Sequence, residues 1–306
     1  MTLARYRQLA IVTTVGICVL VVAGGVVRLT GSGLGCDDWP NCNAERFIDV
    51  STGHAAIEQV NRLLSGLIGL PTLLLAIVSF RAAPRGSGLR WPAIGVLASV
   101  LANGVVGGIA VRGDLHPALV QSHFLLAMIS IAFGLVAIRA SSGRRIEWSG
   151  ALGLDSALRT KLVSALTVVT AAALVTGTVV TGAGPHAGEQ DVRRFGFDIS
   201  QVARLHSGTV IIAVAIGAAL ALSLAQAGDV SVRNAVSSWM FVAILQGGIG
   251  YAQYFTGVPE LLVGTHIAGA TLLWVVTVRL FLTDVDATQE HASVARNAMD
   301  SKRLHV

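Results

Sequence analysis

Charged and aromatic residues are scarce in this 306-residue chain. Asp, Glu, Lys and Arg together make up 13% of the residues and Phe, Trp and Tyr 6%, whereas 53% are hydrophobic. Soluble domains carry about 25% charged residues, and the mean hydropathy of +0.70 lies far outside their range. The composition argues against a water-soluble domain and is typical of an integral membrane protein.

Long apolar runs recur along the whole chain. A bilayer core of about 30 Å needs roughly 20 apolar residues per helix. The first run follows basic residues, as a signal peptide does, but it is too long and lacks a small-x-small cleavage site, so we interpret it as a retained helix. We therefore predict an all-α integral membrane protein with eight transmembrane helices near residues 9–29, 58–80, 93–112, 118–139, 162–182, 201–225, 235–256 and 261–282.

Basic residues are distributed unequally between the two sides of the predicted membrane. Of the 22 Lys and Arg residues, 15 fall on the side that holds Arg5 and Arg81, and 7 on the other. The positive-inside rule then places the N-terminus and the C-terminus in the cytoplasm. The net charge of +5 is explained by these loops, so we expect no nucleic-acid partner. The polar tail, 283–306, is expected to be disordered.

Three pairs of segments match without gaps and in the same order. Residues 57–66 match 199–208, residues 103–123 match 246–266, and 30–33 match 181–184. We predict a duplicated unit whose halves are related by a pseudo-twofold axis along the membrane normal. The predicted parts are an N-terminal four-helix half (1–140), a cytoplasmic connecting loop (141–161), a C-terminal four-helix half (162–282) and the tail.

Three histidines, His123, His206 and His266, lie inside predicted helices. Each comes about six residues after the outer end of its helix, roughly 9 Å deep. An ionisable group at this depth is costly and marks a functional candidate, although hydrogen bonding between packed helices is the alternative. Heme iron explains imidazoles on facing helices best, because two of them bind it axially. Nearby glycines leave room for the macrocycle or simply allow close packing, and they are Gly104, Gly107, Gly108, Gly247, Gly248 and Gly250.

The second predicted helix carries Glu58, Asn61, Arg62 and Ser65 on one face at its outer end. Glu58 is a candidate for proton transfer, and capping of its helix is the alternative. The arginine guanidinium suits a heme propionate but equally an interface anchor. The same two roles are open to Arg28, Arg112 and Arg204.

Only three cysteines occur in the chain. Cys36 and Cys42 lie close together in the first outer loop, in an oxidising compartment, so we predict a disulfide between them. Spacing does not decide whether it staples the loop or exchanges electrons. Cys18 lies within the first helix and is interpreted as a small hydrophobic residue.

Together these residues resemble the heme A synthase family. The resemblance rests on TGSGLGC, WP and Cys in the first outer loop, Glu-x-x-x-Arg in the second helix, TGAGPHAG after the fifth, and histidines on helices four, six and eight. It implies oxidation of a methyl group of heme O to a formyl group by successive hydroxylation, for heme A biosynthesis and terminal oxidases. It implies a b-type heme, iron protoporphyrin IX, with His206 and His266 as axial ligands. His123 would then bind the iron of the substrate heme, Asn61 and Arg62 would help to hold it, and Glu58 would be the essential acid.

The resemblance also implies partners and contains two departures. The implied partners are heme O as substrate, membrane lipid, heme O synthase and a quinol or another electron donor. The family commonly has Glu-x-x-His-Arg in the second helix, whereas this chain has Asn61, a poor ligand for iron. The outer loop between the fifth and sixth helices, Gly184 to Ser200, also lacks the cysteine pair of some members. A non-catalytic b-type cytochrome and a transporter with parallel repeats are the alternative functions.

Overall fold

Eight long helices make up the described part of the chain. A computed structural model describes residues 2–82, 88–143, 158–186, 188–189, 191–225 and 229–304. Within these residues every regular element is helical, and all eight helices are long and apolar enough to cross a membrane. The predicted fold class and number of spans are confirmed. The helices are α1 (Leu3–Leu29), α2 (Gly53–Ala82), α3 (Arg90–Arg112), α4 (Pro117–Ala140), α6 (Leu158–Ala183), α7 (Ile199–Ser223), α8 (Val230–Phe255) and α9 (Glu260–Leu304).

Short polar side chains begin several of these helices. The Asp198 side chain accepts a hydrogen bond from the backbone N–H of Gln201 at 2.9 Å before α7, and Asp229 accepts from Ser231 at 2.8 Å before α8. Such caps satisfy backbone donors that lack a partner inside the helix. Helix α4 begins at Pro117, a position where a missing N–H has no cost.

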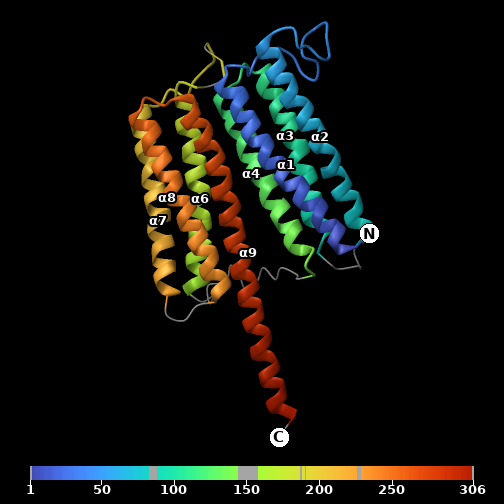
Figure 1. The fold of residues 1–306 in the computed structure, drawn as a ribbon, viewed down its shortest axis with the longest axis vertical. Helices are drawn as coiled ribbons and strands as arrows, with labels where there is room; N and C mark the ends of the chain where they lie inside the picture. The colour runs from blue at the N-terminus through green and yellow to red at the C-terminus, as the bar shows by residue number, and fades with distance from the viewer. Residues whose placement is uncertain are drawn as a thin grey trace.

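The helices form two four-helix bundles that stand side by side (Figure 1). In the N-terminal half, α1 packs on α2, α2 on α3, α3 on α4 and α4 on α1. The helices α6, α7, α8 and α9 form the same closed ring in the C-terminal half. The halves meet where α1 and α4 pack on α9 and where α4 packs on α6. A twofold axis between the halves would give this pattern, although the axis itself stays a prediction.

Both bundles are packed most tightly at the end that holds the N-terminus. There, a cluster in the N-terminal half includes Tyr6 and Leu75, and a cluster in the C-terminal half includes Leu166, Leu220 and Trp239. The Tyr6 hydroxyl donates to the carbonyl of Leu89, and the Trp239 indole N–H donates to Thr277 Oγ1. These polar tips are satisfied, as buried polar groups in lipid require. The two clusters fix the helices at one end and leave the other end free to form a site.

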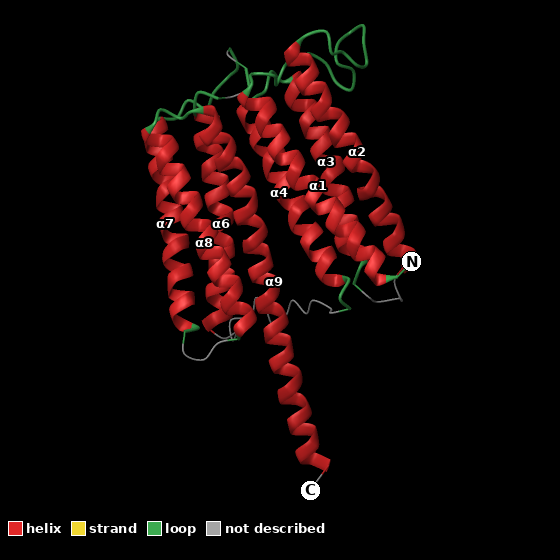
Figure 2. Cartoon of the chain, viewed as in Figure 1, coloured by secondary structure: helices red, strands yellow, loops and turns green. Residues whose placement is uncertain are grey.

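The end of the chain differs from the sequence-based expectation. Helix α9 continues to Leu304, well beyond the predicted disordered start of the tail at residue 283 (Figure 2). The residues concerned contain neither Gly nor Pro and are rich in helix formers. Two ion pairs also hold the first extra turns: Asp284 with Arg159 of α6, at 2.6 Å, and Asp286 with Arg139 of α4. The helix is therefore tied to both halves.

Candidate functional site

His206 of α7 and His266 of α9 face each other inside the C-terminal half. Their ring centroids lie 6.5 Å apart and their planes are nearly perpendicular, at 87°. With metal–nitrogen bonds of about 2.0–2.1 Å, two imidazoles on opposite sides of one metal ion have centroids about 6.4 Å apart. The pair therefore has the spacing that a shared axial metal requires.

The Nδ1 atoms of both rings are engaged by neighbouring helices. Thr176 Oγ1 of α6 lies 3.2 Å from Nδ1 of His206, and the side-chain amide nitrogen of Gln246 in α8 lies 2.9 Å from Nδ1 of His266. Contacts of this kind orient a ligating imidazole. Nε2 is thus available for a metal on His206. An amide nitrogen only donates, so the Gln246 contact places the lone pair of His266 on Nδ1, and Nε2 of His266 is free for a metal once the amide turns its oxygen toward Nδ1.

His123 of α4 has a closely similar setting in the N-terminal half. Its Nδ1 lies 3.0 Å from the carbonyl oxygen of Asn103 in α3. Because a carbonyl only accepts, Nδ1 must carry the proton and Nε2 keeps its lone pair. Asn103 and Gln246 occupy matching positions of the predicted repeat, so the same part of each half contacts the Nδ1 of its histidine.

Glycines bring the histidines close to the neighbouring helices. A Cβ atom placed on Gly107 would lie 2.9 Å from Cε1 of His123, and one placed on Gly250 would lie 3.0 Å from Cε1 of His266. These contacts are too short for a real side chain. The close-packing explanation thus holds for these two glycines, and a larger residue at either position would push the ring away.

Other glycines lie beside open space. A Cβ atom on Gly66, Gly104, Gly208 or Gly247 would meet nothing within 4 Å, and these form two pairs of repeat-equivalent positions. At the same level several helices bury no residue over two or more turns. These loosely packed stretches are 60–71, 100–107, 118–126, 175–181, 199–212 and 247–255. Both halves therefore have weakly buried helix surface and open glycine positions at the depth of the histidines.

The two halves differ at the second ligand. The position that matches His206 in the N-terminal half is Leu64 of α2. The only other histidine within α1 to α4 is His54, which lies in the first turns of α2 and bonds Ser32. Asn61, one turn from Leu64, has a buried Oδ1 atom without a hydrogen-bond partner among the described residues. The N-terminal half thus offers one imidazole where the C-terminal half offers two.

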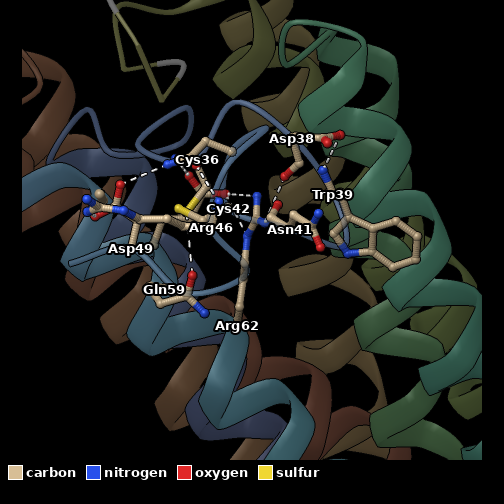
Figure 3. Close-up of a disulfide and its surroundings, with 12 residues drawn as sticks. Cys36, Asp38, Trp39, Asn41, Cys42, Arg46, Asp49, Gln59 and Arg62 are labelled. Carbon is tan, nitrogen blue, oxygen red and sulfur yellow. Dashed lines mark hydrogen bonds and ion pairs between the residues drawn. A yellow bond between two sulfur atoms is a disulfide. The ribbon is translucent and has the colours of Figure 1, made fainter. Parts of the chain in front are cut away.

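Glu58 and Arg62 fasten the loop between α1 and α2, the predicted first outer loop, to α2. Glu58 is buried, accepts a hydrogen bond from the backbone N–H of Cys36 at 2.8 Å and one from Arg62 Nε at 3.0 Å. Arg62 also donates to the carbonyls of Asp38 and Asn41 (Figure 3). These contacts bring the predicted acid and arginine together. They support an anchoring role for both, and leave the roles in proton transfer and propionate binding as predictions.

The predicted disulfide between Cys36 and Cys42 is present at the centre of this loop (Figure 3). The loop also reaches α3, where the Trp39 indole packs on Gly108. Asp38 forms an ion pair with Arg112 at 3.1 Å. The Trp39 backbone N–H and this guanidinium keep the pKa of the Asp38 carboxyl below its usual value. The loop is therefore bound to both α2 and α3 above the N-terminal half.

The remaining candidate arginines also have protein partners. Arg28 of α1 donates to the carbonyls of Thr181 and His186, across the boundary between the halves. Arg204 donates to Ser200 of its own helix. Each of the four candidate arginines thus already has a partner within the protein. Propionate binding by any of them stays a prediction.

Comparison with known proteins places this arrangement in a family. Residues 7–278 match the family model described as cytochrome oxidase assembly protein. The chain belongs to this family. Together with the eight apolar helices, the match identifies a multi-pass membrane protein.

Several curated relatives carry the name heme A synthase, and two illustrate the similarity. The one from Geobacillus kaustophilus (strain HTA426) is 32% identical over 127 residues, which is 41% of this chain and 40% of the relative. The one from Bacillus mycoides (strain KBAB4) is 33% identical over 127 residues, 41% of each protein. The chain thus spans about two fifths of the length of the relatives it matches.

Sequence reasoning missed the groups that hold the imidazoles. Thr176 gave no signal, because threonine is common in apolar helices. Asn103 and Gln246 did stand at the first positions of the longest repeat match, exactly 20 residues before a histidine in each half. Their shared separation was the available signal.

Proposed function

We propose that this protein is a heme A synthase, which oxidises one methyl group of heme O to a formyl group. The observation that carries the proposal is the inequality of the two halves. Each half presents a histidine with an engaged Nδ1, a glycine against its edge and open space at the same depth. Only the C-terminal half adds a facing imidazole.

The C-terminal half is proposed to hold a b-type heme through His206 and His266. The spacing of the two rings, the Thr176 contact to Nδ1 of His206 and the open space beside Gly208 and Gly247 support this proposal. When bound, this heme supplies one-electron transfer. The protein's part is to fix both imidazoles in orientation, since each is held by a side chain of a neighbouring helix.

The N-terminal half is proposed to bind heme O, with His123 as the axial ligand. Leu64 cannot ligate iron and Asn61 is a poor ligand, so a heme bound in this half would have His123 as its one strong protein ligand. Each hydroxylation consumes one dioxygen, two electrons and two protons, and releases one water. Two such steps convert the methyl group into a geminal diol, and loss of water from the diol gives the formyl group.

Glu58 is proposed to handle the protons that this stoichiometry requires. It is the only acidic residue in α1 to α4. Its carboxylate lies at the outer end of α2, one turn from Asn61, where it is already linked to the loop through Cys36 and Arg62. Arg62 is proposed to keep this carboxylate in place and to help hold the substrate.

The partners follow from the same chemistry. An enzyme that makes heme O must supply the substrate, so heme O synthase is the proposed donor of heme. A quinol or another membrane reductant must supply the electrons. A non-catalytic b-type cytochrome is the second candidate, but electron transfer alone gives no reason for an N-terminal half with a single imidazole and one carboxylate.

The test is incubation of the purified protein with heme O, dioxygen and a reductant, followed by identification of the extracted hemes. We expect hemes with hydroxymethyl and formyl groups in place of the methyl group. Recovery of unchanged heme O, under conditions in which the bound b-type heme is reduced, would contradict the enzyme and favour the cytochrome.

A further inference from the structure

Two carboxamide side chains in the membrane part of the N-terminal half lack hydrogen-bond partners among the described residues. The Oδ1 atoms of Asn61 in α2 and Asn103 in α3 are both buried and unpaired. Asn61 lies about 12 Å along α2 from its outer end, and Asn103 about 13 Å along α3. Because α2 and α3 pack on each other, the two amides lie on neighbouring helices at a similar depth.

An unpaired amide is expensive at this depth. A buried polar group without a partner destabilises the protein, and lipid offers no water to replace the partner. Gln246, the repeat counterpart of Asn103, also has an unpaired Oε1, but its amide nitrogen donates to the backbone carbonyl of His266 and contacts its Nδ1. The amides of the N-terminal half therefore point to a polar ligand group.

Both amides belong to the surroundings of His123. The backbone carbonyl of Asn103 holds the Nδ1 of this histidine. Asn61 is one helical turn from Leu64, whose position matches that of His206, the residue that faces the other histidine in the C-terminal half. Open space adjoins Gly66 on α2 and Gly104 on α3. A ligand bound at His123 would thus lie near the side-chain amides of Asn61 on α2 and Asn103 on α3.

We propose that the side chains of Asn61 and Asn103 hydrogen-bond the hydroxyl group that the first oxidation places on the heme methyl, and so retain the alcohol for the second oxidation. This inference rests on the proposed function. The unreacted methyl group forms no hydrogen bonds, whereas the alcohol and the geminal diol both donate and accept, as a carboxamide does. The amides therefore distinguish the intermediate from the substrate.

The first test is equilibrium binding, which requires no turnover. Heme O and its hydroxymethyl derivative are titrated into the purified full-length protein and into Asn61→Leu and Asn103→Leu variants. We expect the wild type to bind the hydroxymethyl derivative roughly fivefold to tenfold more tightly, the value of about one hydrogen bond. Each variant should reduce that preference. Asn234→Leu is the control, because Asn234 lies near the start of α8, far from the level of the histidines, and it should leave the preference unchanged.

The second test is the distribution of products. With heme O, dioxygen and reductant, the Asn61→Leu and Asn103→Leu variants should release more hydroxymethyl heme relative to formyl heme than the wild type. If the amides were only structural, leucine would simply remove an unpaired polar group. The stability of the variants would then rise, while the product ratio and the binding preference would stay unchanged. That result would overturn the inference while the wild type still makes formyl heme. A wild type that oxidises no heme would instead overturn the proposed function and this inference with it.

Discussion

The N-terminal and C-terminal halves of this protein share an architecture but differ in how many ligands they offer. In each half, four helices form a closed ring, and one histidine lies against a glycine of the neighbouring helix. The C-terminal half adds His206 opposite His266, whereas the N-terminal half has Leu64 at that position and a carboxylate nearby. On the proposed function, a few side chains distinguish a site for a permanent heme in one half from a site for a reacting heme in the other.

The largest effect is expected when the C-terminal half loses one of its two histidine ligands, because the difference between the halves then disappears. His266→Ala should abolish the low-spin b-type spectrum, because a single imidazole holds the iron too weakly to keep both axial positions filled. The absorption spectrum of the purified variant measures this. His116→Asn is the matched control, since His116 only caps α4 and asparagine is also a good cap. Survival of the low-spin spectrum in His266→Ala would overturn the ligand assignment.

A second imidazole in the N-terminal half should make the two halves alike. Leu64→His should place a ring opposite His123, fill the open axial position and stop oxidation of bound heme O. The spectrum of the loaded variant should change from high spin to low spin. Leu63→His is the control, because it points about 100° away around α2 and should leave the spin state unchanged. Full activity in Leu64→His would show that residue 64 does not face the substrate iron.

The carboxylate of the N-terminal half has two roles that substitutions can separate. Glu58→Gln keeps an acceptor for the Cys36 N–H but removes the charge, and we expect turnover to fall about 100-fold if proton transfer is lost. Arg62→Gln breaks the same ion pair, which joins atoms 2.6 Å apart, yet leaves the carboxylate. It should therefore cost less activity. Equal losses in the two variants would assign Glu58 to anchoring alone.

The disulfide loop gives the smallest expected effect. The segment that the disulfide closes, 36–42, contacts α2 and α3 of the N-terminal half, so the pair of substitutions Cys36→Ser and Cys42→Ser should destabilise that half by about 2 kcal/mol and weaken heme O binding severalfold. The spectrum of the b-type heme should not change. Thermal unfolding in detergent, followed separately through heme O release and the b-type spectrum, measures both, with Cys18→Ala as the control. A loss of both signals together would show that the loop supports the whole molecule.

Much of this arrangement could be predicted from the sequence. The eight apolar runs predicted the helices, and the closely spaced cysteine pair predicted the disulfide. Both predictions succeeded because hydropathy and spacing are local properties of the sequence. The depth of His206 and His266 also followed from the sequence. Their distance did not, since it depends on how α7 and α9 pack within the ring. The same holds for Glu58, whose contact with Cys36 joins residues separated by a whole loop, and for the helical tail, whose ion pairs with α4 and α6 are long-range.

The spin states of the two hemes test the central claim most directly. Electron paramagnetic resonance of the oxidised, purified protein, loaded with heme b and with heme O, counts low-spin and high-spin iron. Unequal halves predict one low-spin iron per chain, held by His206 and His266, and one high-spin iron at His123. Two low-spin irons per chain, in a protein with both sites filled, would contradict the account.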